Sequence, residues 1–80
     1  MHEVFLAEKI INTISIEAQE KKAEKVLEAR VAIPENEHFT PETFEGILKM
    51  QAEGTMLERA KFYVFREKID KTYIKDIKIK

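Results

Sequence analysis

The chain contains no cysteine, and this absence constrains both how it folds and which chemistry it can carry. With 80 residues, it lies near the lower limit at which a hydrophobic core stabilises a domain without crosslinks. Disulfides, iron–sulfur clusters, thiol nucleophiles and cysteine-ligated zinc are excluded. We therefore expect one domain over residues 1–80 that is held together by apolar packing and binds no zinc.

The first half of the chain predicts a helix followed by a strand. From Glu3 to about Lys22, apolar residues recur at the spacing of one helix face, with Leu6 and Ile10 alongside: Val4, Ala7, Ile11, Ile14 and Ala18. Residues 26–33 then alternate, which indicates a strand that Pro34 ends. Its predicted inward face comprises Leu27, Ala29, Val31 and Ile33.

The second half predicts a helix and two strands. Thr40 suits the N-cap of the helix, Pro41 its first position and Gly54 a left-handed stop. Residues 60–67 and 72–79 have the composition of strands, and the turn at 68–71 is short enough for a hairpin. In the last strand, Tyr73, Ile77 and Ile79 are expected on one side.

These elements predict an α+β fold in the order helix, strand, helix, strand, strand. Two helices on one face of a three-stranded sheet bury its apolar residues. The helical connection favours a parallel first pair of strands, and a hairpin makes the second pair antiparallel, so the sheet is expected to be mixed. The expected core comprises Leu27, Val31, Ile47, Leu48, Phe62, Val64, Ile77 and Ile79.

Composition argues against several classes of function. The net charge is −1 although 36% of residues are charged, whereas a general nucleic-acid binder carries a cationic excess. Glu3, Glu8 and Lys9 interrupt the first apolar stretch, so we expect neither a signal peptide nor a membrane segment, and a cytoplasmic location. No nucleophile is placed with a base, so we expect no enzyme activity. Tyr63 and Phe65 are expected as an exposed aromatic patch on the outer sheet face, which packing or partner contact explains at least as well as base stacking.

The residues Met1, His2 and Glu3 form a candidate metal site. Histidine at the second position is too bulky for ready removal of the initiator methionine, so a free Met1 amine should persist. That amine, the His2 amide nitrogen and the His2 imidazole can close two fused chelate rings, which suit square-planar nickel(II) or copper(II). Glu3 can add an oxygen. The alternative is a frayed terminus with a histidine of no special role.

A second histidine, His38, lies in the acidic loop with Glu35 and Glu37. These three residues could hold a metal ion, but no second histidine nearby in the sequence completes the site. An exposed loop histidine ahead of a helix cap is the better interpretation.

The chain resembles the HypA family of nickel metallochaperones over nearly its whole length. The resemblance is carried by the opening Met1-His2-Glu3, the segment 29–33 followed by Pro34-Glu35, and Gly54-Thr55 with Glu58 and Ala60. Residues 77–79 resemble the closing strand of the family. Family members usually have Gly-Glu where this chain has Pro34-Glu35.

The resemblance implies a function and partners. A nickel-binding accessory protein for maturation of [NiFe] hydrogenase, or of urease in some organisms, would hold nickel(II) through the Met1 amine and the backbone and side chain of His2, beside Glu3. It would act with a HypB-like GTPase and deliver to the hydrogenase large subunit, with no nucleic acid or membrane as partner.

The chain also departs from the family. Family members insert a zinc-binding domain with two Cys-x-x-Cys pairs between the last two strands, where this chain has only the turn at 68–71. The chain thus resembles the nickel-binding domain alone. The alternative function is a zinc-less interaction module that no longer carries metal.

Overall fold

The computed structural model describes residues 2–80, which begin with helix α1 at His2–Glu20. The predicted apolar face is confirmed, because the buried side chains of α1 are Ala7, Ile10, Ile11, Ile14 and Ala18. The helix ends where Lys22 adopts a φ of 57° and the N–H groups of Lys22 and Ala23 donate back to its last turn. No helix in residues 2–80 is long and apolar enough to cross a membrane.

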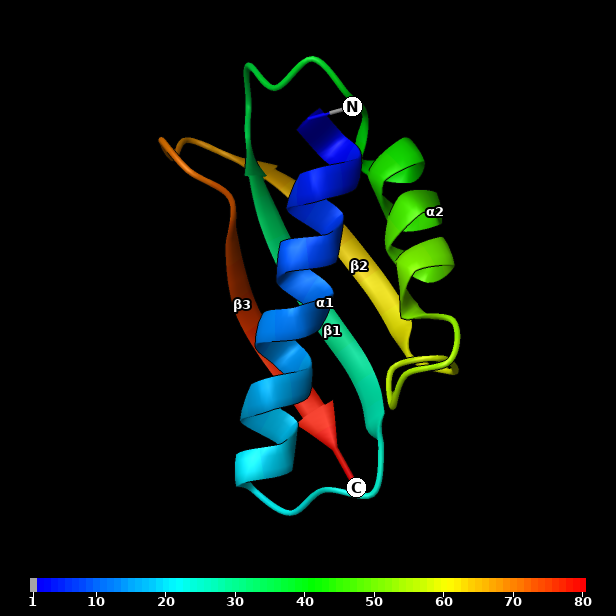
Figure 1. Cartoon of the computed structure of the whole chain (residues 1–80). Helices are drawn as coiled ribbons and strands as arrows, with labels where there is room; N and C mark the ends of the chain where they lie inside the picture. The colour runs from blue at the N-terminus through cyan, green and yellow to red at the C-terminus, as the bar shows by residue number, and fades with distance from the viewer. Residues whose placement is uncertain (1) are drawn as a thin grey trace.

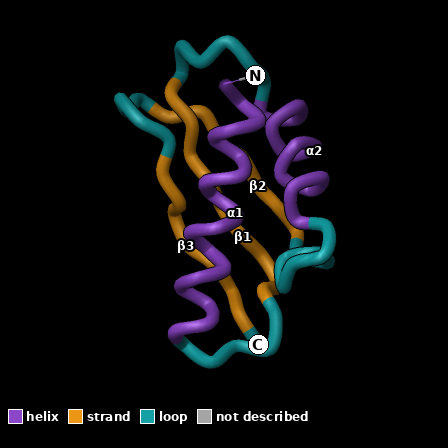
Figure 2. Tube along the Cα trace, in the orientation of Figure 1, coloured by secondary structure: helices purple, strands orange, loops and turns teal. Residues whose placement is uncertain are grey.

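The sheet has three strands, β1 at Val26–Pro34, β2 at Lys61–Glu67 and β3 at Tyr73–Ile79. Their order is β2-β1-β3, with β1 parallel to β2 and antiparallel to β3. The expected α+β class, the element order and the mixed sheet are confirmed. Figure 1 shows both helices on the same face of the sheet, as predicted, and Figure 2 shows the elements along the chain trace.

The predicted hairpin between the last two strands is wrong, because β3 pairs with the far edge of β1. The connection, residues 68–72, crosses the end of β1 at Pro34. This crossing covers two interstrand spacings, about 10 Å, and five residues can span up to about 17 Å. It places β1 in the centre, where its residues Ala29, Val31, Ala32 and Ile33 are all 0% exposed.

Helix α2 spans Pro41–Ala52 and has the predicted ends. The Thr40 hydroxyl accepts a hydrogen bond from the Thr43 N–H at 3.1 Å, which is the expected N-cap, and Pro41 is the first helical residue. Gly54 adopts a φ of 78° two residues after the helix, as its predicted role as a stop requires. Phe39, the residue before the cap, stacks on Phe44 with ring centroids 4.8 Å apart.

The core lies between the helices and the sheet, and most of its predicted members are confirmed. Val31, Leu48, Phe62 and Val64 are buried. Ile47, Ile77 and Ile79 are partly buried against them. Tyr63 and Phe65 are exposed by 40% and 39%, as expected for an aromatic patch on the outer face of the sheet.

The predicted core position Leu27 and the predicted shared face of Tyr73 with Ile77 and Ile79 are wrong, because the strands contain register shifts. Leu27 is 41% exposed while Val26 is buried, since the pairing with β3 shifts between Val26 and Glu28. Tyr73 is likewise 44% exposed and Ile74 packs against the core, since a second shift separates the partners of Arg30 and Val31. A single extra residue reverses which side chains face inward.

The crossing of β1 is fastened by Glu67 at the end of β2, which leads to a prediction about acid stability. Its carboxylate pairs with Lys75 and accepts a hydrogen bond from the Tyr73 hydroxyl at 3.0 Å. The hydrogen bond from Lys75, followed by that from Tyr73, holds the pKa of Glu67 below the usual 4.5. A depressed folded-state pKa contributes stability above the unfolded pKa, and this is lost as the pH falls through the folded pKa.

We therefore expect the free energy of unfolding to fall more steeply below pH 4.5 in the native chain than in Glu67→Gln. Urea unfolding followed by circular dichroism from pH 7 down to about 2.5 measures this. Glu20→Gln, at an exposed end of α1, is the matched control and should follow the native curve. Parallel pH profiles for native and Glu67→Gln proteins would contradict the assignment.

Candidate metal centre

The first turn of α1 presents the predicted site residue His2 to solvent. His2 is the first residue of α1 and its side chain is 59% exposed. The first four N–H groups of any helix have no acceptor within the helix, so the amide of His2 is not engaged in the helical ladder. Met1, the other half of the predicted chelate, lies outside the described residues.

Glu3 adds negative charge to the same turn. The pKa of its carboxyl is lowered, chiefly by a hydrogen bond with its own backbone N–H and to a smaller extent by the charge of His38. Both effects favour the ionised form. A carboxylate at the start of a helix also interacts favourably with the helix dipole. The environment of His2 therefore favours a cation.

The loop between β1 and α2 lies beside the start of α1 (Figure 1). The ring centroids of His2 and His38 are 6.1 Å apart. Glu37 lies between the two rings, with one oxygen 3.3 Å from His38 Nδ1 and the other 3.7 Å from His2 Nε2. From the sequence, the N-terminal site and the loop site were predicted as two separate candidates. In the structure, His2, Glu37 and His38 are neighbours. Glu35, the third residue of the predicted loop site, is exposed in the same loop.

Arg66 of β2 fixes the backbone of this loop through hydrogen bonds from its guanidinium. Its guanidinium donates to the backbone carbonyls of Glu35 and Glu37, both at 3.0 Å, and of Phe39 at 2.9 Å. A fourth, longer contact of 3.5 Å reaches the carbonyl of Pro34. The planar fork of an arginine carries five N–H donors in fixed directions, against three on a lysine, and so suits several acceptors spread along one loop. The backbone that carries Glu37 and His38 is thus fixed by one side chain from the sheet.

Phe39 anchors the end of the loop in the core. It is 4% exposed, stacks on Phe44 and contacts the rings of His2 and His38 at centroid distances of 6.1 and 5.5 Å. A residue before the cap that packs on the fourth residue of the helix forms a hydrophobic staple. The two histidines therefore lie against a rigid aromatic support.

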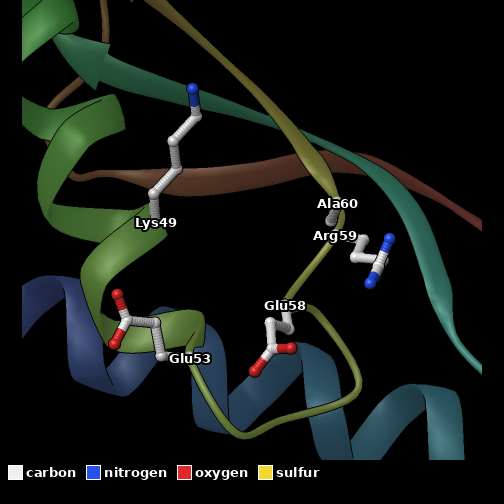
Figure 3. A pocket seen from close by; sticks show the side chains of 5 residues that line it. All are labelled: Lys49, Glu53, Glu58, Arg59 and Ala60. Carbon is white, nitrogen blue, oxygen red and sulfur yellow. The ribbon is translucent and has the colours of Figure 1, made fainter.

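A hollow of about 300 Å³ opens beside His2 and Glu37, and Asp70 and Thr72 of the β2–β3 connection also line it. A larger hollow of about 530 Å³ lies at the other end of α2. Figure 3 shows that charged side chains surround it, with Lys49 and Arg59 pointing away from each other. One of its carboxylates, Glu58, already accepts a hydrogen bond from the Gly54 N–H at 2.7 Å. The carboxylate of Glu58 thus stabilises the turn after α2, and no histidine lines the larger hollow.

The donor chemistry of the N-terminal region fits a late divalent transition metal. Imidazole nitrogens are preferred by nickel, copper and zinc, and a carboxylate can serve as a further ligand or orient a ring. Within residues 2–80, no three His, Asp or Glu side chains lie at the mutual positions of a preformed metal cluster. The described residues thus provide two imidazoles and one carboxylate side by side, with both rings largely exposed.

Comparison with known proteins identifies the family. The model of the family described as "Hydrogenase/urease nickel incorporation, metallochaperone, hypA" matches residues 1–72. The chain belongs to the HypA family. This result confirms the resemblance seen in the sequence. The HypA match begins at the first residue and continues through the second strand and the crossing connection.

Three curated proteins, each named hydrogenase maturation factor HypA, are similar to this family member. The protein of Methanopyrus kandleri is 36% identical over 75 residues, 94% of this chain and 51% of its own length. That of Methanothermobacter thermautotrophicus is 39% identical over 62 residues, 78% of this chain and 51% of its own. That of Archaeoglobus fulgidus is 34% identical over 70 residues, which are 88% of this chain and 64% of its own length. The chain spans about half the length of the first two relatives.

Sequence reasoning about this HypA family member missed two features of the site. The proximity of His38 to His2 joins residues 36 positions apart, and no local pattern reports it. The role of Arg66 was also missed, because a charged residue on a strand is normally expected to point into solvent. The staple was readable, since Phe39 and Phe44 flank the Thr40 cap at the spacing that such a contact requires.

Proposed function

We propose that the chain is a nickel-binding accessory domain that holds nickel(II) for insertion during [NiFe] hydrogenase maturation. Membership of the HypA family carries this proposal. The position of His2, exposed in the first turn of a helix beside a negative charge, supports it. The proposed action is to bind and release an ion, so no residue acts as a catalyst. Residues 1–80 form one domain for this purpose.

Nickel, the cargo, would be held by the N-terminal residues themselves. The Met1 amine, the His2 amide nitrogen and His2 Nδ1 close a five-membered and a six-membered chelate ring. Three nitrogens in one plane suit nickel(II). The His2 amide can lose its proton to the ion at little expense to the helix, because first-turn N–H groups have no intrahelical acceptor. Glu3 lies next to the chelate and offsets the charge of the ion.

The partners follow from the family rather than from any surface of the domain. Proteins named as hydrogenase maturation factors act on a hydrogenase, and the resemblance implies delivery to its large subunit together with a HypB-like GTPase. An N-terminal chelate suits such a transfer because it is held at the free end of a helix. A partner can reach the ion without unfolding the core.

The test is isothermal titration of tag-free protein with nickel(II). Native protein should bind one equivalent, and His2→Ala should lose the site because the chelate loses its imidazole and one of its two rings. Asn12→Ala, an exposed position on the same helix, should bind as the native protein does. Circular dichroism confirms that each variant is folded. Native-like affinity in His2→Ala would reject the proposed site, and no binding by native protein would reject the function.

A further inference from the structure

Strand β2 forms one edge of the sheet, and alternate residues direct their backbone groups away from β1. The N–H of Val64 points to this free edge, because it donates to the carboxylate of Glu45 on α2 at 3.1 Å. The carbonyl of Glu67 points the other way, since it accepts a hydrogen bond from the Glu35 N–H at the end of β1. Because successive residues of a strand alternate in direction, the N–H of Phe62 faces the free edge as that of Val64 does.

Helix α2 lies along this edge, and Figure 1 shows α2 and β2 running in opposite directions. One turn of the helix, four residues, rises about 6 Å, and two residues of a strand rise about 6.6 Å. The step from Glu45 to Lys49 therefore leads to the preceding outward N–H of β2, which is that of Phe62. A hollow of about 320 Å³ lies there, and Lys49, Lys61 and Phe62 are among the residues that line it.

The positive charges at this hollow are not balanced within the described domain. Figure 3 shows Lys49 extending along β2, away from Glu53. Lys61 is paired in register with Glu28 of β1, whose carboxylate is taken by Lys78 at 3.1 Å. Within residues 2–80, neither Lys49 nor Lys61 forms an ion pair, and no carboxylate lines the hollow. Two ammonium groups and an outward N–H thus meet where the domain supplies no anion.

We propose that this end of the β2 edge docks an extended, acidic segment of a partner protein, with one carboxylate held by the Phe62 N–H, Lys49 and Lys61. Glu45 provides the precedent within the domain, because its carboxylate makes the same contact with the Val64 N–H. A hydrogen bond from an N–H to a charged acceptor is about twice as strong as a neutral one. The surface lies toward the far end of α2 from the start of α1, and its role does not depend on nickel binding.

An extended segment fits this place better than a second copy of the domain. Glu45 occupies the Val64 N–H, which prevents a long ladder with another strand and confines pairing to the first residues of β2. The alternate side chains of an extended segment point to the two faces of the sheet. On the outer face, Tyr63 is 40% exposed and offers an aromatic surface to an apolar side chain. Glutamate with apolar neighbours is therefore the composition that the site accepts.

The test is titration of isotope-labelled, tag-free and metal-free protein with the acetylated, amidated peptide Val-Glu-Val-Glu-Val, followed by two-dimensional NMR. The amide of Phe62 should show the largest shift on the edge, whereas that of Val64, already bonded to Glu45, should shift less. The peptide Val-Gln-Val-Gln-Val should bind at least about 10-fold more weakly, because a neutral amide is a weaker acceptor and forms no ion pair. Binding of the glutamate peptide should weaken as salt is added.

Three variants separate a defined site from general attraction to positive charge. Lys49→Gln and Lys61→Gln should each weaken binding of the glutamate peptide by about 3- to 10-fold, between the loss of an exposed ion pair and that of a charged hydrogen bond. Arg59→Gln is the matched control, because it removes a nearby cation whose side chain points away from Lys49 (Figure 3). It should bind as the native protein does. All three side chains are exposed, so circular dichroism should show native folding in each variant.

Four outcomes would overturn the docking site. Equal losses in all three variants would mean diffuse attraction without defined contacts. A shift of the Phe62 amide by inorganic phosphate, at the concentrations used for the glutamate peptide, would mean a site for free anions. Broadening of the β2 amides with protein concentration, before any peptide is added, would mean that a second copy covers the edge. An unshifted Phe62 amide would mean that the edge binds nothing. None of these results changes the nickel titration, which tests the proposed function separately.

Discussion

Adding one residue before Met1 is expected to abolish tight nickel binding, although every side chain of the domain is retained. The added residue converts the Met1 amine into an amide and moves the free amine one residue away. The ion then loses the five-membered ring that the amine closes with the His2 amide nitrogen. His2 and His38 still offer imidazoles, but two monodentate ligands replace a fused chelate.

The measurement is nickel titration of native and N-terminally extended proteins, both without tags. Their unfolding curves should coincide, because α1 begins at His2 and the side chain of His2 is 59% exposed. Full nickel affinity in the extended protein would end the N-terminal proposal. The native affinity should also fall with the pH, since protons compete with the ion for the amine and imidazole nitrogens.

The same titration separates three arrangements of ligands. A site in the loop alone, built on Glu37 and His38, predicts indifference to the extension and complete loss in His38→Ala. An N-terminal chelate alone predicts loss on extension and indifference to His38→Ala. A shared site predicts loss on extension and a partial loss in His38→Ala.

The limits of the fold prediction can be traced to β3. Periodicity identified each helix and strand, since each has a face that must be buried. Periodicity does not report which edge of the sheet a strand joins. A connection of five residues fits a hairpin with β2 as well as a crossing to the far side of β1. The residues at the end of β1 are all apolar, which suits a central strand and is the sequence signal for the crossing.

The limits of the site prediction have a similar origin. His2 could be singled out because its chemistry depends on its neighbours in sequence, which the chain itself displays. His38 could not be joined to it, because the contact depends on how α1 and the loop pack together. That packing depends in turn on Arg66, whose hydrogen bonds go to backbone carbonyls and leave no pattern in the sequence. Hydrogen bonds from a side chain to distant backbone carbonyls cannot in general be predicted from the spacing of residue types.

Phe44 links the stability of the domain to the support of the loop, and its truncation is expected to unfold most of the protein. Its side chain is 0% exposed at the centre of the core and stacks on Phe39. Replacing a buried phenylalanine with alanine typically costs about 3–5 kcal/mol through lost burial and a cavity. A domain of this size has a total stability of about 3–5 kcal/mol, so Phe44→Ala removes nearly all of it.

Three proteins compared by urea unfolding with circular dichroism test this expectation. Phe5→Ala is the matched control, since Phe5 is 67% exposed and its loss should change the free energy of unfolding by no more than about 0.5 kcal/mol. Phe44→Leu keeps an apolar side chain in the core but loses the stack on Phe39, worth about 0.5–1.5 kcal/mol, and should remain folded and measurable. Phe44→Ala should show little native helix even without denaturant. A Phe44→Ala protein as stable as Phe5→Ala would mean that the core does not depend on the Phe39–Phe44 contact, and that the loop carrying His38 is held by Arg66 alone.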